Sequence, residues 1–307
     1  MAHDEGPGAT DPNSAVGTVS SHSLESPRWG KWPAWAALAL FIVLVLGPVV
    51  YKQAPREISR WYHAAAVEHH LDGRLADAKD SLDKAVAWYP DDGRLLLQRA
   101  EWEREAGDYE GALRTCEQAQ ERSVHPLRVL LERSLIHQHL KRWADALDDW
   151  KQIAALVEEG EGTLSNASVL NGLAYARALA DTELDKTLQD AERAVELLGQ
   201  NAALLDTRGF VHYRLKNWEA ARRDLDAAIA LLDSERSSGS AGASEPERAS
   251  EDPREAKRQR RERDRTLAVL IYHRMLVLEQ QTDSVAAADA DRKRIQELGF
   301  SPDDSLF

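Results

Sequence analysis

Hydrophobic positions follow two patterns along this 307-residue chain, one continuous and one periodic. The continuous pattern runs from Trp32 to Tyr51, 20 residues without a charged side chain. At about 1.5 Å per residue, such a helix reaches about 30 Å, the thickness of a bilayer's hydrocarbon core. A buried core helix is rarely apolar on every face, and a signal peptide has a shorter apolar region with a small-residue cleavage site. The pattern therefore predicts one uncleaved transmembrane helix over residues 32–51.

The residues that flank this stretch fit a membrane interface. Aromatic and cationic side chains stand at both ends, where they can reach the headgroups; they are Trp29, Lys31, Trp32, Trp35, Tyr51 and Lys52. Orientation is nearly balanced, because Arg28 and Lys31 precede the stretch while Lys52, Arg56 and Arg60 follow it. The excess of one cation favours a cytoplasmic C-terminal domain only slightly, and the side of the membrane stays open.

The periodic pattern begins after this stretch and repeats every 34 residues. A small residue recurs at Ala78, Ala112 and Ala146. Ala221 occupies the same position in a later unit. Four positions after each of these alanines comes an apolar residue, at Leu82, Cys116, Trp150 and Leu225. Seven positions after it comes a small or apolar residue, at Ala85, Ala119, Ile153 and Ala228. Spacings of four and seven place these side chains on one face of a helix. A small residue on that face lets a second helix approach closely.

Each small residue also ends a recurring six-residue phrase, at residues 73–78, 107–112, 141–146 and 216–221. These residues resemble the tetratricopeptide repeat family, whose 34-residue unit is a helix–turn–helix. The resemblance implies an all-α fold, a solenoid of about five to six helix pairs, which follows the transmembrane helix predicted above. The units are 59–92, 93–126, 127–160, 167–201 and 202–235. The fourth departs from the pattern, because Thr187 occupies the small position.

The remaining segments complete the predicted organisation. A Gly-, Ser- and Pro-rich tail over residues 1–31 is expected to be disordered, and the solenoid covers residues 56–232. Residues 233–265 are expected to form a low-complexity loop, to residue 253, followed by a charged helix start. Residues 266–307 are expected to form a degenerate helix pair that caps the stack.

Composition and motifs disfavour several function classes. With 39 basic and 52 acidic residues, the net charge of -13 disfavours nucleic-acid binding. The sequence holds no phosphate-binding loop, metalloprotease motif or nucleophile elbow, so we expect no enzyme activity, no catalytic residues and no cofactor. His63 and His70 share a helix face, but a pair of histidines is more often solvated than metal-binding, so no metal is expected. Cys116 fills an apolar core position of its repeat.

The resemblance further implies that the first helices of successive pairs line a groove that binds peptides or helices. Arginines beside leucines and aromatics suit a peptide that carries acids or a terminal carboxylate. The alternative is that these are ordinary exposed residues. The predicted groove residues are Arg60, His63, Val67, His70, Arg94, Leu97, Glu101, Arg104, Arg128, Leu131, Leu135, Asn171, Tyr175, Asp206, Phe210 and Tyr213.

Three functions remain open at this point. The first is a non-catalytic scaffold or adaptor, anchored in a membrane as a single-pass protein, which binds other proteins in the groove. The second is an envelope-side chaperone or assembly factor for exported proteins. The third, an enzyme with an unrecognised site, ranks last. Partner identity and oligomeric state stay open. The carboxylate clamp known in the family is not supported, because His63 and Val67 stand where the clamp has Lys and Asn.

Overall fold

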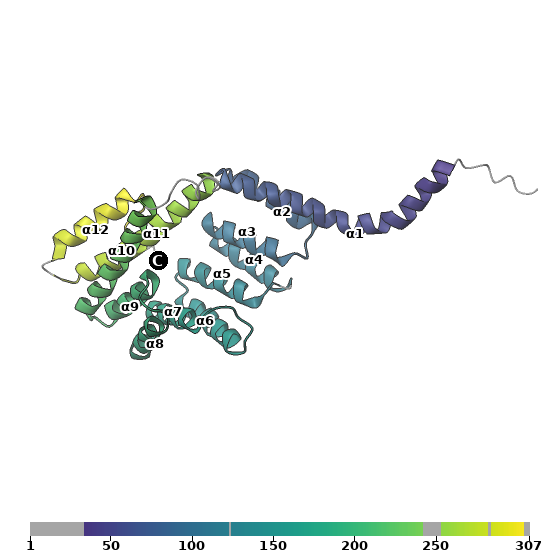
Figure 1. Ribbon diagram of the computed structural model, residues 1–307. Helices are drawn as coiled ribbons and strands as arrows, with labels where there is room; N and C mark the ends of the chain where they lie inside the picture. Colours follow the sequence, from purple (N-terminus) through teal and green to yellow (C-terminus); the bar gives the residue numbers. More distant parts are fainter. Residues whose placement is uncertain (1–33, 123, 242–252, 282–283, 304–307) are drawn as a thin grey trace, which may run out of the picture. The chain divides into compact units, whose positions relative to one another are not determined.

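The computed structural model describes residues 34–122, 124–241, 253–281 and 284–303, and these ranges contain no strand. The predicted tail over residues 1–31 and residues 242–252 of the predicted loop lie outside them. Residues 1–52 and 53–307 form two compact units. The helices, labelled in Figure 1, are α1 (Ala34–Leu71), α2 (Leu75–Trp88), α3 (Gly93–Glu105), α4 (Tyr109–Gln120), α5 (Pro126–His139), α6 (Trp143–Glu158), α7 (Asn166–Ala180), α8 (Leu184–Leu198), α9 (Ala202–Arg214), α10 (Trp218–Ala241), α11 (Pro253–Leu278) and α12 (Val285–Glu297).

Helix α1 differs from the predicted transmembrane helix over residues 32–51. It continues to Leu71, so the apolar stretch and the first helix of the solenoid belong to one element. Within the described ranges, no single helix is both long and apolar enough to cross a membrane, but Leu38–Val49 and Tyr51–Leu71, with a bend between them, meet the requirement together. Pro48 precedes the break. Proline lacks a backbone N–H, and its ring clashes with the preceding turn, so it bends a helix at this point.

From residue 53 onward the helices pack in consecutive pairs, as predicted. Each of α3 to α11 contacts the next helix in the chain, and the first helices of neighbouring pairs also meet, α3 with α5, α7 with α9, and α9 with α11. The end of α1 joins this array, because Ser59 Oγ donates to the carbonyl of Ala85 at 2.8 Å. The all-α class and the helix pairing are therefore confirmed for the described residues.

The recurring small residues lie where the second helix of each pair meets the first. They are fully buried, or nearly so, at Ala78, Ala112, Ala146, Ala221 and Ala288. Thr187 is buried at the same position of the fourth pair. Its hydroxyl donates to the carbonyl of Glu183 at 2.9 Å, so the extra polar atom stays hydrogen-bonded. This bond explains how a threonine fits where the pattern predicts a smaller apolar residue.

The first residue of the recurring phrase ends the first helix of each pair. Gly73, Gly107, Lys141 and Lys216 all have positive φ, between 55° and 83°. The amide of the next residue donates to a carbonyl five residues back, as Arg74 does to His69 and Asn217 does to His212. This is the left-handed C-cap that satisfies the last carbonyls of a helix. The phrase therefore encodes the turn within each pair.

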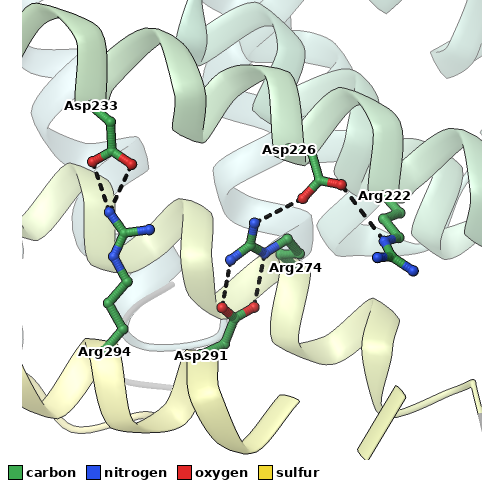
Figure 2. Close-up of polar contacts among 6 residues, drawn as sticks. All are labelled: Arg222, Asp226, Asp233, Arg274, Asp291 and Arg294. Carbon is green, nitrogen blue, oxygen red and sulfur yellow. Dashed lines mark hydrogen bonds and ion pairs between the residues drawn. The ribbon is translucent and has the colours of Figure 1, made fainter. Parts of the chain in front are cut away.

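The predicted loop over residues 233–253 is wrong in its first part. Helix α10 continues to Ala241, and its residue Asp233 has a partner that composition does not reveal. Arg294 of α12 donates to both carboxylate oxygens of Asp233, at 2.7 and 2.8 Å (Figure 2). Helix α11 begins at Pro253, so the charged run and the apolar positions from Leu267 onward share one helix.

A buried arginine–aspartate contact joins the two helices of four pairs. In each case the aspartate follows the small position of the second helix by three residues. The four pairs are Arg133–Asp149, Arg177–Asp190, Arg208–Asp224 and Arg274–Asp291. In the last pair, Arg274 also donates to Asp226 of α10 at 2.8 Å, so one guanidinium joins α10, α11 and α12 (Figure 2).

Candidate protein-binding face

Helices α1 and α3 lie side by side and are joined by side chains one repeat apart. His63 Nε2 and Gln98 Oε1 are within hydrogen-bond distance, and His70 Nε2 lies 3.0 Å from Glu105 Oε2. The imidazole of His70 also stacks on the indole of Trp102, with 4.4 Å between the ring centroids. These contacts align equivalent positions of the first two pairs.

The same relation continues from α3 to α5. Arg104 Nε donates to Glu132 Oε1 at 2.5 Å, and Arg128 lies 4.0 Å from Glu101. Leu135 is 42% exposed on α5, one helical turn before His139. We call the exposed side chains of α1, α3 and α5 along this line of contacts the first-helix face. It is continuous across three pairs.

Several predicted groove residues are exposed on this face, but their charges are already balanced. The side chain of Arg94 is 77% exposed and pairs with Asp92 at 2.8 Å. Its hydrogen bond lowers the pKa of the Asp92 carboxyl. Arg60 pairs with Glu57 at 2.7 Å in the same way. The sequence suggested that these arginines bind an acidic peptide. In the structure, Arg94 and Arg60 already pair with acidic residues of the same chain.

Leu97 and Phe210 are corrections to the predicted groove. Their exposed fractions are only 1% and 2%. Leu97 belongs to the core cluster that also contains Leu96 and Ala100. Phe210 stacks on His273 of α11, with 4.8 Å between the ring centroids. Side chains of a first helix that face the next pair are buried by that pair. Neither Leu97 nor Phe210 can therefore contact another protein.

The remaining predicted residues lie in the second half of the array or between pairs. Asp206 is buried, and its Oδ1 lies 2.7 Å from Nδ1 of His273. Tyr175 and Tyr213 are half-buried and pack in the cluster around Phe210. Two others are half-buried at contacts within the array, namely Asn171 and Leu131. The structure thus brings the predicted residues of α1, α3 and α5 together on an exposed line, whereas those of α7 and α9 meet one another in the cluster around Phe210.

A pocket of about 230 Å³ closes one end of the first-helix face. It is lined by side chains of the second pair, of α5, of α11 and of the segment after α12, namely Arg104, Glu105, Tyr109, His139, Arg265, Phe300 and Ser301. Burial lowers the pKa of His139 to about 4, and the cations of Arg265 and Arg104 add to the shift. The imidazole is therefore neutral at pH 7, and it stacks on Tyr109 with centroids 4.9 Å apart.

Sequence reasoning missed the stacked and lateral partners on this face. Trp102, Glu105 and His139 were not predicted as part of the site. A signal existed, because His70 and Glu105 stand 35 residues apart, about one repeat. Side chains near equivalent positions of neighbouring first helices can touch, so complementary residues at this spacing predict lateral contacts.

Comparisons with known proteins address the fold. No protein-family model matches the sequence, and no curated protein matches it. The structure is similar to a tetratricopeptide repeat protein from Parabacteroides merdae ATCC 43184, with a TM-score of 0.54 and 15% identity over 81% of this chain and 83% of that chain. This likeness shows that the chain has the fold of a tetratricopeptide repeat solenoid.

Two further solved structures are similar over shorter or looser superpositions. MamA, residues 41 to the end, from Desulfovibrio magneticus RS-1 has a TM-score of 0.48 and 17% identity over 57% of this chain and 96% of that chain. PilF from Pseudomonas aeruginosa has a TM-score of 0.47 and 15% identity over 80% of this chain and 98% of that chain. The statement about the fold rests on the Parabacteroides protein.

Proposed function

We propose that this chain is a non-catalytic scaffold, held at a membrane, that binds other proteins through the first-helix face. The observation that supports the binding role most directly is the continuity of this face across α1, α3 and α5. Exposed polar side chains such as Arg128 alternate there with an exposed apolar side chain, Leu135. A segment of another protein laid across three helices can use both kinds of contact.

The proposed membrane tether rests on apolar side chains that nothing in the structure covers. In the first half of α1 the exposed fractions of the large apolar residues lie between 46% and 72%. Burying such a run in lipid removes apolar surface from water. The exposed residues are Trp35, Leu38, Leu40, Phe41, Ile42, Val43, Leu44, Val45 and Val49. We propose this segment as the single-pass anchor, with residues 53–307 on the cytoplasmic side.

The binding role is tested on the full-length chain, tagged at its C-terminus and cross-linked in intact cells. The test variant carries Arg128→Glu and Leu135→Glu on the first-helix face. The control carries Arg114→Glu and Gln118→Glu, which make the same change in net charge at two exposed positions of α4. We expect at least a tenfold loss of a defined set of cross-linked proteins in the test variant and no loss in the control. Equal recovery from both variants would contradict the proposal.

The tether and its orientation are tested separately. Extraction of membranes at alkaline pH releases peripheral proteins but leaves spanning ones in the pellet. We expect the full-length chain in the pellet and a chain without residues 34–52 in the supernatant. A reporter fused after Phe307, active only in the cytoplasm, should be active. An inactive reporter would place the solenoid on the opposite side.

A further inference from the structure

Helix α11 consists of two halves with different surroundings. Its buried residues begin at Leu267 and continue to Leu278, and this half packs against α12, α10 and α9. The preceding residues, Pro253–Arg265, are mostly exposed. They carry seven basic and three acidic side chains. We call Pro253–Arg265 the α11 strap.

The strap reaches the far end of the solenoid through its side chains. Arg254 Nη1 lies 2.5 Å from Asp72 Oδ1, although 182 residues separate the two in the sequence. One helical turn further on, Arg258 Nη2 lies 4.0 Å from Glu105 Oε1. At the end of the strap, Arg265 lines the pocket that also contains His139. Three of the seven cations of the strap thus lie at the ends of α1, α3 and α5.

The acids that the strap contacts stand at positions where an isolated carboxylate is unfavourable. Asp72 follows the last residue of α1, and Glu105 is the last residue of α3. The C-terminus of a helix carries partial negative charge, so a carboxylate is repelled there and a cation is attracted. The hydrogen bond from Arg254 lowers the pKa of Asp72, with Arg74 adding to the effect. The strap therefore adds positive charge at these helix ends, beside Arg74 at Asp72 and His70 at Glu105.

We infer that the α11 strap is an autoinhibitory contact that runs along the C-terminal ends of α1, α3 and α5, at the edge of the first-helix face, and limits the access of partner proteins to this face. The inference rests on the proposed function, since it describes how the same face is regulated. The strap contacts this face from α1 to the pocket beside α5. A protein that occupies the face must displace the strap or bind beside it.

The contact has the properties of a reversible one. The side chains of Arg254 and Arg258 are 43% and 60% exposed, so salt screens both ion pairs. The strap forms the N-terminal turns of α11, and helix ends can fray, so these turns can leave their contacts while the buried half stays packed. Higher ionic strength should therefore open the strap without unfolding the solenoid.

The test uses the full-length chain in lipid nanodiscs, with Cys116→Ala and spin labels at Lys79→Cys and Gln259→Cys. Both labelled positions are exposed, and neither is one of the residues named above in the contacts of the strap. The opening variant carries Arg254→Ser and Arg258→Ser. The matched control carries Arg260→Ser and Arg261→Ser, which remove the same charge from exposed positions of the same helix. Pulsed electron resonance measures the distance between the labels in low and high salt.

We expect the opening variant in low salt to show the longer label distance that the unmodified strap shows only in high salt. The control should keep the shorter distance in low salt. In cells, the opening variant should recover at least three times more of the proteins whose cross-linking depends on Arg128 and Leu135, and the control should not. An unchanged distance, or a longer distance without greater recovery, would overturn the inference.

The two proposals fail in different ways. If recovery depends on Arg128 and Leu135 but not on the strap, the binding role stands and the inference falls. If recovery depends on neither, the binding role itself falls, and the label distance then reports a contact that regulates nothing.

Discussion

At the scale of single residues, arginine–aspartate contacts join the two helices of four pairs. Asp149 is 2% exposed, and its carboxylate accepts from Arg133 of the facing helix, with Nε at 2.9 Å. Burial raises the pKa of this carboxyl, and the bond to Arg133 opposes the shift. Removing one partner of such a pair leaves the other buried without compensation. The pair therefore matters more to stability than the surface ion pairs do.

The substitution Asp149→Ala should lower the free energy of unfolding of the 53–307 unit by about 3 kcal/mol. Urea unfolding followed by circular dichroism measures this change. Asp80→Ala is the control, because the Asp80–Lys84 pair is exposed and such pairs contribute less than about 1 kcal/mol. Similar losses in both variants would show that the buried pair has no special weight.

The neutral imidazole of His139 makes stability depend on pH. Its pKa is about 4 in the folded chain against 6.5 for the free side chain. The unfolded chain therefore takes up the proton first, and the contribution of His139, complete above pH 6.5, is lost as the pH falls toward 4. His139→Phe keeps the ring on Tyr109 without a titrating group, so its stability should fall less between pH 6.5 and 4. Parallel pH profiles would contradict this assignment.

Residue identity predicted some of these features and not others. The burial of Cys116 was predicted from its place in the repeat and is confirmed. The partner of a charged residue was not predicted, because register places Arg133 on a helix but does not reveal that Asp149 faces it. Arg94 and Arg104 were assigned to a groove for acids on the same grounds, and both pair with acids of their own chain.

At the scale of the helices, the residue in the left-handed conformation at the turn within a pair affects the free energy of unfolding. Lys216 has a φ of 61°, at the position where Gly107 has 83°. A side chain in this left-handed region costs about 1 kcal/mol relative to glycine. Lys216→Gly should therefore raise the free energy of unfolding by about 1 kcal/mol, and Gly107→Lys should lower it by a similar amount. Chemical denaturation of both variants measures the two changes in the free energy of unfolding. Changes of the same sign would contradict this explanation.

The contact between α6 and α7 depends on a glycine. A Cβ atom added at Gly172 would lie 2.2 Å from the ring of Trp150. Gly172→Ala should therefore lower the free energy of unfolding by about 2 kcal/mol, because overpacking costs more than the helix propensity of alanine returns. Trp150→Leu should cost less in the Gly172→Ala background than in the wild type. Additive effects of the two substitutions would show that they do not share this contact.

Helix pairing was predictable because the small residue recurs with the period of the fold. The ends of α10 and α11 were not, since they depend on contacts between distant segments. Asp233 lies in a polar stretch whose composition predicts a loop. The sequence does not show that Arg294 of α12 pairs with it. Gly172 shows the same limit, because the spacing predicts a close approach of helices but not which ring fills the space.

At the scale of the whole chain, the repeat predicted the order of helices and the candidate face, but not what covers the face. Leu97 and Phe210 are covered by neighbouring pairs. The strap, part of the sixth pair, contacts the first pair through the ion pair between Arg254 and Asp72. No local sequence pattern predicts this contact. Long-range contacts of this kind depend on the summed twist of all pairs, which the sequence of any one unit does not contain.

The central claim is that proteins bind the first-helix face of the full-length chain. The most direct measurement places a photoreactive amino acid at Leu135 of α5 or, in a separate chain, at Leu198 of α8, which is 55% exposed. Illumination of intact cells should give discrete cross-linked products from position 135 and none from position 198. Products from position 198 alone, or equal products from both, would contradict the claim.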